Sequence, residues 1–144
     1  MNDFEIDIVF SRLTKMEDYL KRLEGYKSIT LKEYVENQDS QLITERLIQV
    51  ITEAALDVTK HLLSCLGVLQ QRDSWTNKDY FLEAQKQGIL SEEIAQELAR
   101  AAGMRNILVH AYLNIEPNQV FFAISKCLKI YPVYMRQVMT YLDS

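Results

Sequence analysis

Helical periodicity of the apolar residues constrains the fold of this chain more than any other feature. Four long stretches carry apolar residues at alternating spacings of three and four, which is typical of helices that bury one face. The first stretch shows the pattern in its simplest form, with Val9, Leu13, Met16, Leu20 and Leu23. Only four glycines and two prolines occur in 144 residues, whereas an all-β chain of this length needs many more turn residues. The sequence therefore predicts an all-α protein.

Turn and capping residues divide this pattern into about four to five main helices. The signals are N-terminal caps at Asp39 or Ser40, at Asn77 and at Ser91, and stops at Gly25, Gly67 and Gly88. The stretch from Ser28 to Gln38 is expected to be a short helix or a connection. Pro117 begins the last helix, and Pro132 within it is expected to kink that helix or split it. Short connections make neighbouring helices antiparallel, so we expect one domain over residues 1–144, folded as an antiparallel helical bundle.

Composition and charge exclude several classes of protein. The chain is 48% hydrophobic and 25% charged, which is the balance of a globular protein. Charged residues interrupt every apolar stretch, and the N-terminus lacks a basic segment followed by an apolar run, so we expect neither a membrane span nor a secretory signal. Cys65 and Cys127 are too few for a disulfide framework or a four-cysteine zinc site, which favours a cytoplasmic location. The net charge of −4 argues against broad binding to nucleic acids, but it permits one local anion site.

The residues with chemical uses gather in one segment, Arg105-Asn106-Ile107-Leu108-Val109-His110-Ala111-Tyr112. At about 100° per residue, Arg105 and Tyr112 share one face of a helix, and Asn106 and His110 share an adjacent face. Arg105 and His110 diverge by about 140° on an ideal helix. One straight helix therefore holds this pair poorly against a common phosphate. Either the helix ends or bends here, or a second copy of the chain completes the site.

Residue types alone leave a structural interpretation of this segment open. A single histidine beside apolar residues is more often a core or interface residue than a catalyst. On that interpretation, Arg105 is an ion-pair partner between helices, and Tyr112 is a half-buried aromatic residue with a hydrated hydroxyl group. The segment as a whole is then interface packing in a purely structural dimer.

The segment also resembles the Arg-x4-His-x-Tyr signature of the HepT-like toxins, a branch of the HEPN (higher eukaryotes and prokaryotes nucleotide-binding) superfamily. Four further stretches resemble the second helix and the middle turn of that family: Glu45–Val50, Glu53–Val58, Tyr80–Phe81 and Gly88–Leu90. Two features depart from the family pattern. Relatives often carry a larger aromatic residue in place of Gly103-Met104, and an aspartate commonly precedes the proline where this chain has Glu116. Neither departure touches the arginine, histidine or tyrosine of the signature.

The resemblance implies a metal-independent endoribonuclease that needs no cofactor and works as a homodimer with the motif near the dimer interface. His110 would take a proton from a ribose 2′-hydroxyl group, whose oxygen attacks the adjacent phosphorus and leaves a 2′,3′-cyclic phosphate. Arg105 would donate hydrogen bonds to the phosphate oxygens, where negative charge accumulates. Asn106 would orient His110 or the backbone of Arg105. Nothing in the sequence identifies the RNA target.

The resemblance further implies a protein partner. Members of this family are toxins of type VII-like toxin–antitoxin systems. Their antitoxin is a minimal nucleotidyltransferase of the MNT type, which transfers AMP from ATP to the motif tyrosine, here Tyr112. A phosphodiester on Tyr112 would block the substrate and pair with Arg105. The alternative is a non-catalytic helical subunit that binds nucleotide or docks the nucleotidyltransferase.

Several other positions are candidates for function or for packing. Arg46 either forms a structural ion pair, which we favour, or reaches toward the motif. His61 is expected to be structural, because we identify no cysteine or carboxylate at ligand spacing. Trp75 is either a partner anchor or an ordinary exposed aromatic residue. Three tyrosines are expected to pack in the core or at its rim, namely Tyr131, Tyr134 and Tyr141.

Overall fold

The computed structural model describes residues 1–71, 74–110 and 112–144, apart from the side chains of residues 70, 71 and 112. Within those ranges the chain forms six α-helices and two short 3-10 turns, and no β-strand. The α-helices are α1 (Asp3–Glu24), α2 (Leu31–Glu36), α3 (Gln38–Cys65), α4 (Asn77–Lys86), α5 (Glu92–His110) and α6 (Pro117–Asp143). The 3-10 turns are η1 (Val68–Gln71) and η2 (Tyr112–Asn114). The predicted all-α fold is confirmed, with the short helix α2 as one element beyond the main helices.

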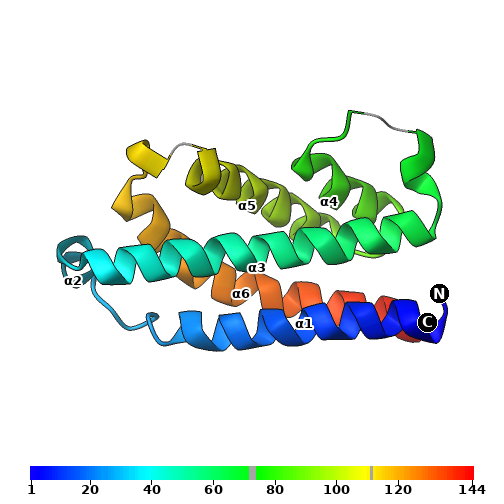
Figure 1. Ribbon diagram of the computed structural model, residues 1–144, viewed down its shortest axis with the longest axis horizontal. Coiled ribbons are helices and arrows are strands. Elements are labelled where there is room, and N and C mark those ends of the chain that lie inside the picture. The colour runs from blue at the N-terminus through cyan, green and yellow to red at the C-terminus, as the bar shows by residue number, and fades with distance from the viewer. Residues whose placement is uncertain (72–73, 111) are drawn as a thin grey trace.

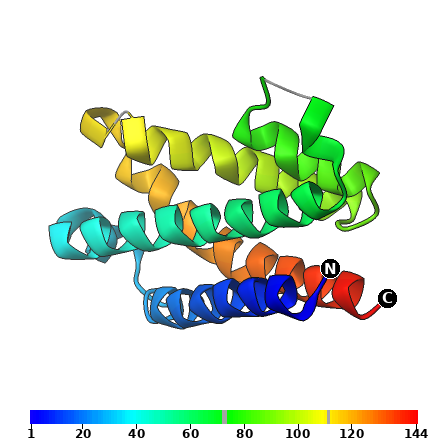
Figure 2. The same cartoon turned by 45° about the vertical axis from the view of Figure 1, so that its right-hand side comes forward.

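Helix α3 is the centre of the bundle and contacts every other α-helix. It lies across the middle of the molecule, with α1 and α6 on one side and α4 and α5 on the other (Figure 1). The chain runs along α3 in the direction opposite to that in α1 and in α5, as the colours of Figures 1 and 2 show. The two termini lie together at one end of the bundle, and α2 and η2 lie at the other (Figures 1 and 2). The end of α5 that carries the motif is therefore far from both termini.

Side-chain caps fix where the helices begin. Ser91 caps α5 as predicted, because the Ile94 amide donates a hydrogen bond to Ser91 Oγ at 3.3 Å. The cap predicted at Asp39 or Ser40 is wrong, since Asn37 caps α3 and its Oδ1 accepts a hydrogen bond from the Ser40 amide at 3.0 Å. Three other helices also begin one residue after an asparagine or threonine cap, with Asn2 before α1, Thr30 before α2 and Thr76, rather than the predicted Asn77, before α4.

Two glycines turn the chain after helices, as predicted. Gly67 follows α3 and Gly88 follows α4, and both have a φ of 77°, in the left-handed region that favours glycine. The Gly88 amide donates a hydrogen bond to the Gln85 carbonyl at 3.0 Å, which closes the turn. This turn brings α5 back along α4, its closest neighbour.

Helix α6 is continuous through Pro132, so of the two expected outcomes, a kink or a split, the split does not occur. Tyr131 and Tyr134 lie on either side of the proline and are both fully buried. Their hydroxyl groups form hydrogen bonds with Thr52 and Thr59 of α3 at 2.7 and 2.8 Å. Packing against α3 on both sides of Pro132 therefore offsets the backbone hydrogen bond that proline removes.

Threonines of α3 form hydrogen bonds with tyrosines inside the core. Thr44, Thr52 and Thr59 recur at about two-turn intervals along the buried side of α3. Each forms a hydrogen bond with a tyrosine hydroxyl group, in the pairs Tyr34–Thr44, Tyr131–Thr52 and Tyr134–Thr59. Burial raises the pKa of all three tyrosines. The predicted packing role of Tyr131 and Tyr134 is confirmed, and Tyr141 lies partly buried at the rim.

No helix among the residues that the structure describes combines the length and the apolar character needed to cross a membrane.

Candidate active site

The motif occupies the C-terminal end of α5. Arg105 and His110 both belong to α5, and His110 is the last residue of that helix. Tyr112 begins η2, and its side chain lies outside the described residues. The helix thus continues as far as His110 and carries both residues, so the divergence of about 140° between them applies in this chain.

Arg105 points toward the central helix and forms an ion pair there. Its Nη2 and Nε atoms lie 3.0 and 3.2 Å from Oε1 of Glu53 on α3. The arginine side chain is 22% exposed and the glutamate side chain 34%, so the pair lies at the edge of the core and not inside it. The interhelical ion pair of the structural interpretation is therefore present.

Asn106 contacts the guanidinium group of its neighbour. Its Oδ1 atom accepts hydrogen bonds from Arg105 Nη1 at 3.3 Å and from Asn77 Nδ2 on α4 at 3.5 Å. The residue was expected to orient His110 or the backbone of Arg105. The structure instead brings the amide oxygen of Asn106 to the arginine side chain.

His110 is exposed at the end of α5 and has no hydrogen-bonding partner within the described ranges. Large apolar side chains are exposed on the segments next to it. Ile107 is 40% exposed, and Leu113 on η2 is 84% exposed. The surroundings of His110 are thus open and partly apolar, unlike those of Arg105.

Glu53 and Gln49 are the site residues that sequence reasoning missed. Gln49 Nε2 donates a hydrogen bond to Glu53 Oε1 at 3.2 Å, and the same oxygen accepts from Arg105. The available signal was a carboxylate in the apolar pattern of α3, which we used only for the likeness of Glu53–Val58 to the family's second helix.

The secondary candidates divide between packing and surface roles. Arg46 is exposed and forms no ion pair with any described residue, so the favoured ion pair is absent. Trp75 is partly buried, and its ring packs edge to face on Tyr80 with centroids 5.1 Å apart.

His61 does have a potential ligand at helical spacing, and the statement that it lacks one is wrong. Cys65, four residues further along α3, has its Sγ atom 3.9 Å from His61 Nε2. The same sulfur lies 3.5 Å from Oε2 of Glu5. No group of three or more potential ligands in the part of the chain that the structure describes is arranged to hold a metal ion.

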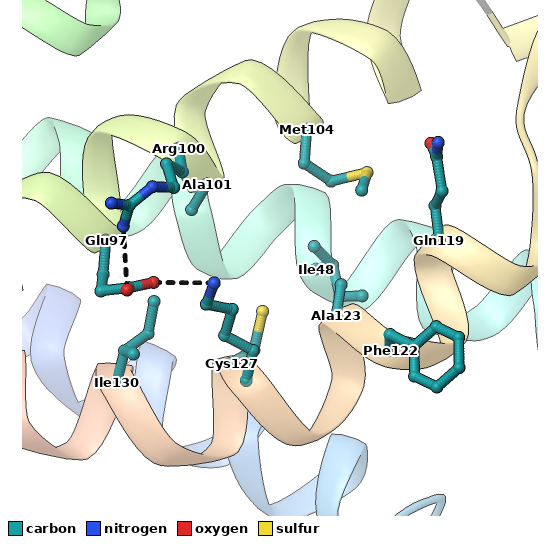
Figure 3. Close-up of a pocket in the computed structure, with 11 residues that line it drawn as sticks. Ile48, Glu97, Arg100, Ala101, Met104, Gln119, Phe122, Ala123, Cys127 and Ile130 are labelled. Carbon is teal, nitrogen blue, oxygen red and sulfur yellow. Dashed lines mark hydrogen bonds and ion pairs between the residues drawn. The ribbon is translucent and has the colours of Figure 1, made fainter.

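A separate cavity of about 380 Å³ lies between α5 and α6 (Figure 3). Its floor is apolar and includes Ile48, Met104 and Cys127. At its rim, the Glu97 carboxylate forms ion pairs with Arg100 and Lys126, each at 2.9 Å. Neither Arg105 nor His110 lines this cavity, so the motif and the cavity are distinct features of the surface.

Comparison with known proteins gives a consistent result. A family model described as "Ribonuclease HepT-like" matches residues 16–138. The chain is 44% identical over 142 residues to a protein of Aphanizomenon flos-aquae named tRNA nuclease HepT, and the match covers 99% of this chain and 95% of that one.

Solved structures show the same fold at low sequence identity. A tri-AMPylated HEPN toxin of Shewanella oneidensis, in complex with an MNT antitoxin, matches with a TM-score of 0.81 and 18% identity, over 97% of this chain and 99% of that chain. A toxin–antitoxin structure with AMP-PNP matches with a TM-score of 0.82 and 16% identity, over 93% and 98% of the two chains.

Proposed function

Because this chain belongs to the family of HepT-like ribonucleases, we propose that it is a metal-independent endoribonuclease with Arg105 and His110 as its catalytic residues. The observation that carries the proposal is the placement of this pair. Arg105 keeps two guanidinium N–H groups that make no hydrogen bond to a described residue, and His110 is exposed one and a half turns further along α5. Both groups can therefore meet a large substrate.

The proposed reaction uses the RNA's own hydroxyl group as the nucleophile. A neutral ring nitrogen of His110 takes the proton of a ribose 2′-hydroxyl group, and the 2′-oxygen forms a bond to the adjacent phosphorus. The bond from phosphorus to the 5′-oxygen breaks, and that oxygen takes up a proton. The products are a 2′,3′-cyclic phosphate and a 5′-hydroxyl end. Arg105 stabilises the negative charge that builds up on the phosphate oxygens during the attack.

A second copy of the chain completes the proposed site. On one straight helix, Arg105 and His110 are separated by about 7.5 Å along the axis and by about 140° around it. In a homodimer, Arg105 of one protomer and His110 of the partner subunit face the same phosphodiester. The exposure of Ile107 within the motif and of Leu113 just after it supports this arrangement, because large exposed apolar side chains mark protein interfaces.

The proposed substrate is transfer RNA, and the proposed setting is a cytoplasmic toxin–antitoxin system of the type VII-like class. The substrate is supported by the relative that is 44% identical and is named a tRNA nuclease. The partner is supported by the fold that this chain shares with a tri-AMPylated HEPN toxin bound to an MNT antitoxin. A nucleotidyltransferase of that type would transfer AMP from ATP to the hydroxyl group of Tyr112 and release pyrophosphate. The bound AMP places a negative charge near Arg105 and excludes RNA.

Incubation of the purified protein with tRNA in the presence of EDTA tests the catalytic proposal. We expect cleavage by the wild-type protein and a loss of at least about 100-fold in Arg105→Ala and His110→Ala. The chain offers matched controls in Arg100→Ala, an exposed arginine of the same helix, and His61→Ala, the other histidine. Equal, background-level cleavage by the wild-type protein and all four variants would favour the non-catalytic docking subunit instead.

Mass spectrometry tests the modification. After incubation with ATP and a candidate nucleotidyltransferase antitoxin of the MNT type, the wild-type chain should gain the mass of AMP and lose its cleavage of tRNA. Tyr112→Phe should gain no AMP and keep cutting in the presence of the antitoxin. AMP found at another residue of Tyr112→Phe would reject Tyr112 as the acceptor.

A further inference from the structure

Side chains from three helices surround the guanidinium group of Arg105. Glu53 and Gln49 come from α3, Asn77 comes from α4, and Asn106 comes from α5 itself. Glu53 Oε1 is the centre of this network, because it accepts hydrogen bonds from Gln49 Nε2, Arg105 Nε and Arg105 Nη2 at 3.0 to 3.2 Å.

The hydrogen bonds leave two N–H donors of Arg105 without an acceptor among the described residues. A guanidinium group has five N–H donors in a fixed plane. Glu53 accepts from Nε and from one hydrogen of Nη2, and Asn106 accepts from one hydrogen of Nη1. One hydrogen therefore remains on each terminal nitrogen. Donors on both terminal nitrogens are available to phosphate oxygens.

We propose that Glu53 is a positioning residue, which holds Arg105 by one edge so that its two remaining donors are ready for the RNA phosphate. The role rests on the proposed ribonuclease activity and acts through Arg105. Arginine has a long side chain with much rotamer freedom. If this side chain becomes ordered only in the transition state, the loss of conformational entropy reduces the stabilisation that the contact with the phosphate provides. Glu53 orders the side chain before RNA binds.

The burial of the pair separates this role from a purely structural one. Both side chains are partly exposed, at 22% and 34%, and ion pairs near the surface contribute little to folding. The negative charge of Glu53 also lowers the attraction of this surface for RNA. Glu53 thus contributes little to the stability of the fold, and its charge disfavours the binding of RNA. Its effect on the position of Arg105 explains why a glutamate occurs here.

Steady-state kinetics on tRNA with variants of Glu53 test the proposal. We expect kcat to fall about 10-fold in Glu53→Gln, which keeps an acceptor oxygen but loses the charge-assisted bonds, and about 100-fold in Glu53→Ala. KM should stay the same or fall in both, because one negative charge leaves the site. A structural defect would also lower the apparent kcat at unchanged KM, because it lowers the fraction of active protein. It would lower the melting temperature in parallel, whereas the positioning role predicts a melting temperature near that of wild type in both variants.

Asp57→Asn is the matched control. It removes one negative charge from α3 a single turn beyond Glu53, and Asp57 is exposed and makes no contact with Arg105. Its kcat should stay within about twofold of wild type. Glu53→Ala should also have no further effect in an Arg105→Ala background, because the effects of residues that act through one another do not add.

The outcomes separate this proposal from the proposed function. If the wild-type protein cuts tRNA and Glu53→Ala cuts it with the kcat of Asp57→Asn, the positioning role is wrong and the ribonuclease remains. Additive losses in the double variant would also overturn it. If the wild-type protein does not cut RNA, both the proposed function and the positioning role of Glu53 are wrong.

Discussion

Arg105 and His110 lie on one helix, yet their side chains have different surroundings. Arg105 is fixed at 3.0 Å from Glu53 of the central helix, whereas His110 is exposed at the last residue of α5. The helix stays regular through both positions, so the two groups do not converge within one chain. The proposed function therefore places the phosphodiester between two copies of the chain.

Mixing two inactive variants tests this arrangement. Arg105→Ala and His110→Ala should each lose cleavage when assayed alone. After they are unfolded together and refolded, about half of the dimers are mixed, and each mixed dimer has one intact site, so about a quarter of the wild-type activity should return. The measurement is the rate of tRNA cleavage as a function of the mixing ratio, with a maximum expected at equal amounts.

The control is the same procedure with each variant refolded separately, which should restore nothing. Native electrophoresis of tagged chains shows whether mixed dimers form. If they form and the co-refolded variants are no more active than the separately refolded ones, the two catalytic groups belong to one chain. A protein that is monomeric at assay concentration and still cuts RNA would exclude the shared site altogether.

The hydrogen bond between Thr52 and Tyr131 predicts unequal effects for its two partners. Thr52 Oγ1 donates to the Ile48 carbonyl at 2.9 Å, so it accepts the bond from the Tyr131 hydroxyl group at 2.7 Å. Tyr131→Phe removes one hydrogen bond and leaves no orphaned donor, which should lower the free energy of unfolding by about 1 kcal/mol. Thr52→Val leaves a fully buried hydroxyl group without a partner and should cost about 2–3 kcal/mol.

Urea denaturation of both single variants and of the double variant measures these differences. The double variant should cost less than the sum of the singles, because it contains no unpaired hydroxyl group. A Thr52→Val variant that is no less stable than Tyr131→Phe would show that the buried hydroxyl group finds another partner.

The sequence was a good guide to the helices because their apolar spacing repeats over many turns. The residue at which each helix begins was harder to predict. Asn37, Asp39 and Ser40 are all good capping residues within four positions, and their order alone does not decide which one accepts the first amide hydrogen bond. Of the kink or split expected at Pro132, the split does not occur for a different reason, since contacts with α3 hold α6 on both sides of the proline.

The candidate site was predictable only in its local part. The motif residues are close in sequence, so their spacing and their likeness to a known signature could be read directly. The partner of Arg105 is 52 residues away, and it is brought there by the packing of α3 against α5. The contact between His61 and Cys65 could have been predicted, because Cys65 stands at the i+4 position of the same helix. This spacing was overlooked.

The Glu97 carboxylate makes the stability of the α5–α6 contact depend on pH. The hydrogen bond from Lys126 is the main cause that holds the pKa of Glu97 below its ordinary value of 4.5. The unfolded chain therefore binds this proton more readily than the folded chain does, so the contribution is present above pH 4.5 and is lost as the pH falls through the lower pKa of the folded state. At neutral pH it should amount to about 0.5–1 kcal/mol, because the Lys126 side chain is 53% exposed and water screens the pair.

Urea unfolding of wild type and Glu97→Gln between pH 7 and pH 3 measures this contribution. Wild type should be the more stable protein at neutral pH, and the difference should shrink toward zero on acidification. Lys126→Gln should remove most of the same pH dependence, since it removes the main cause of the low pKa of Glu97. A difference between wild type and Glu97→Gln that stays constant down to pH 3 would mean that the carboxylate contributes through packing, and that its ionisation does not stabilise the fold.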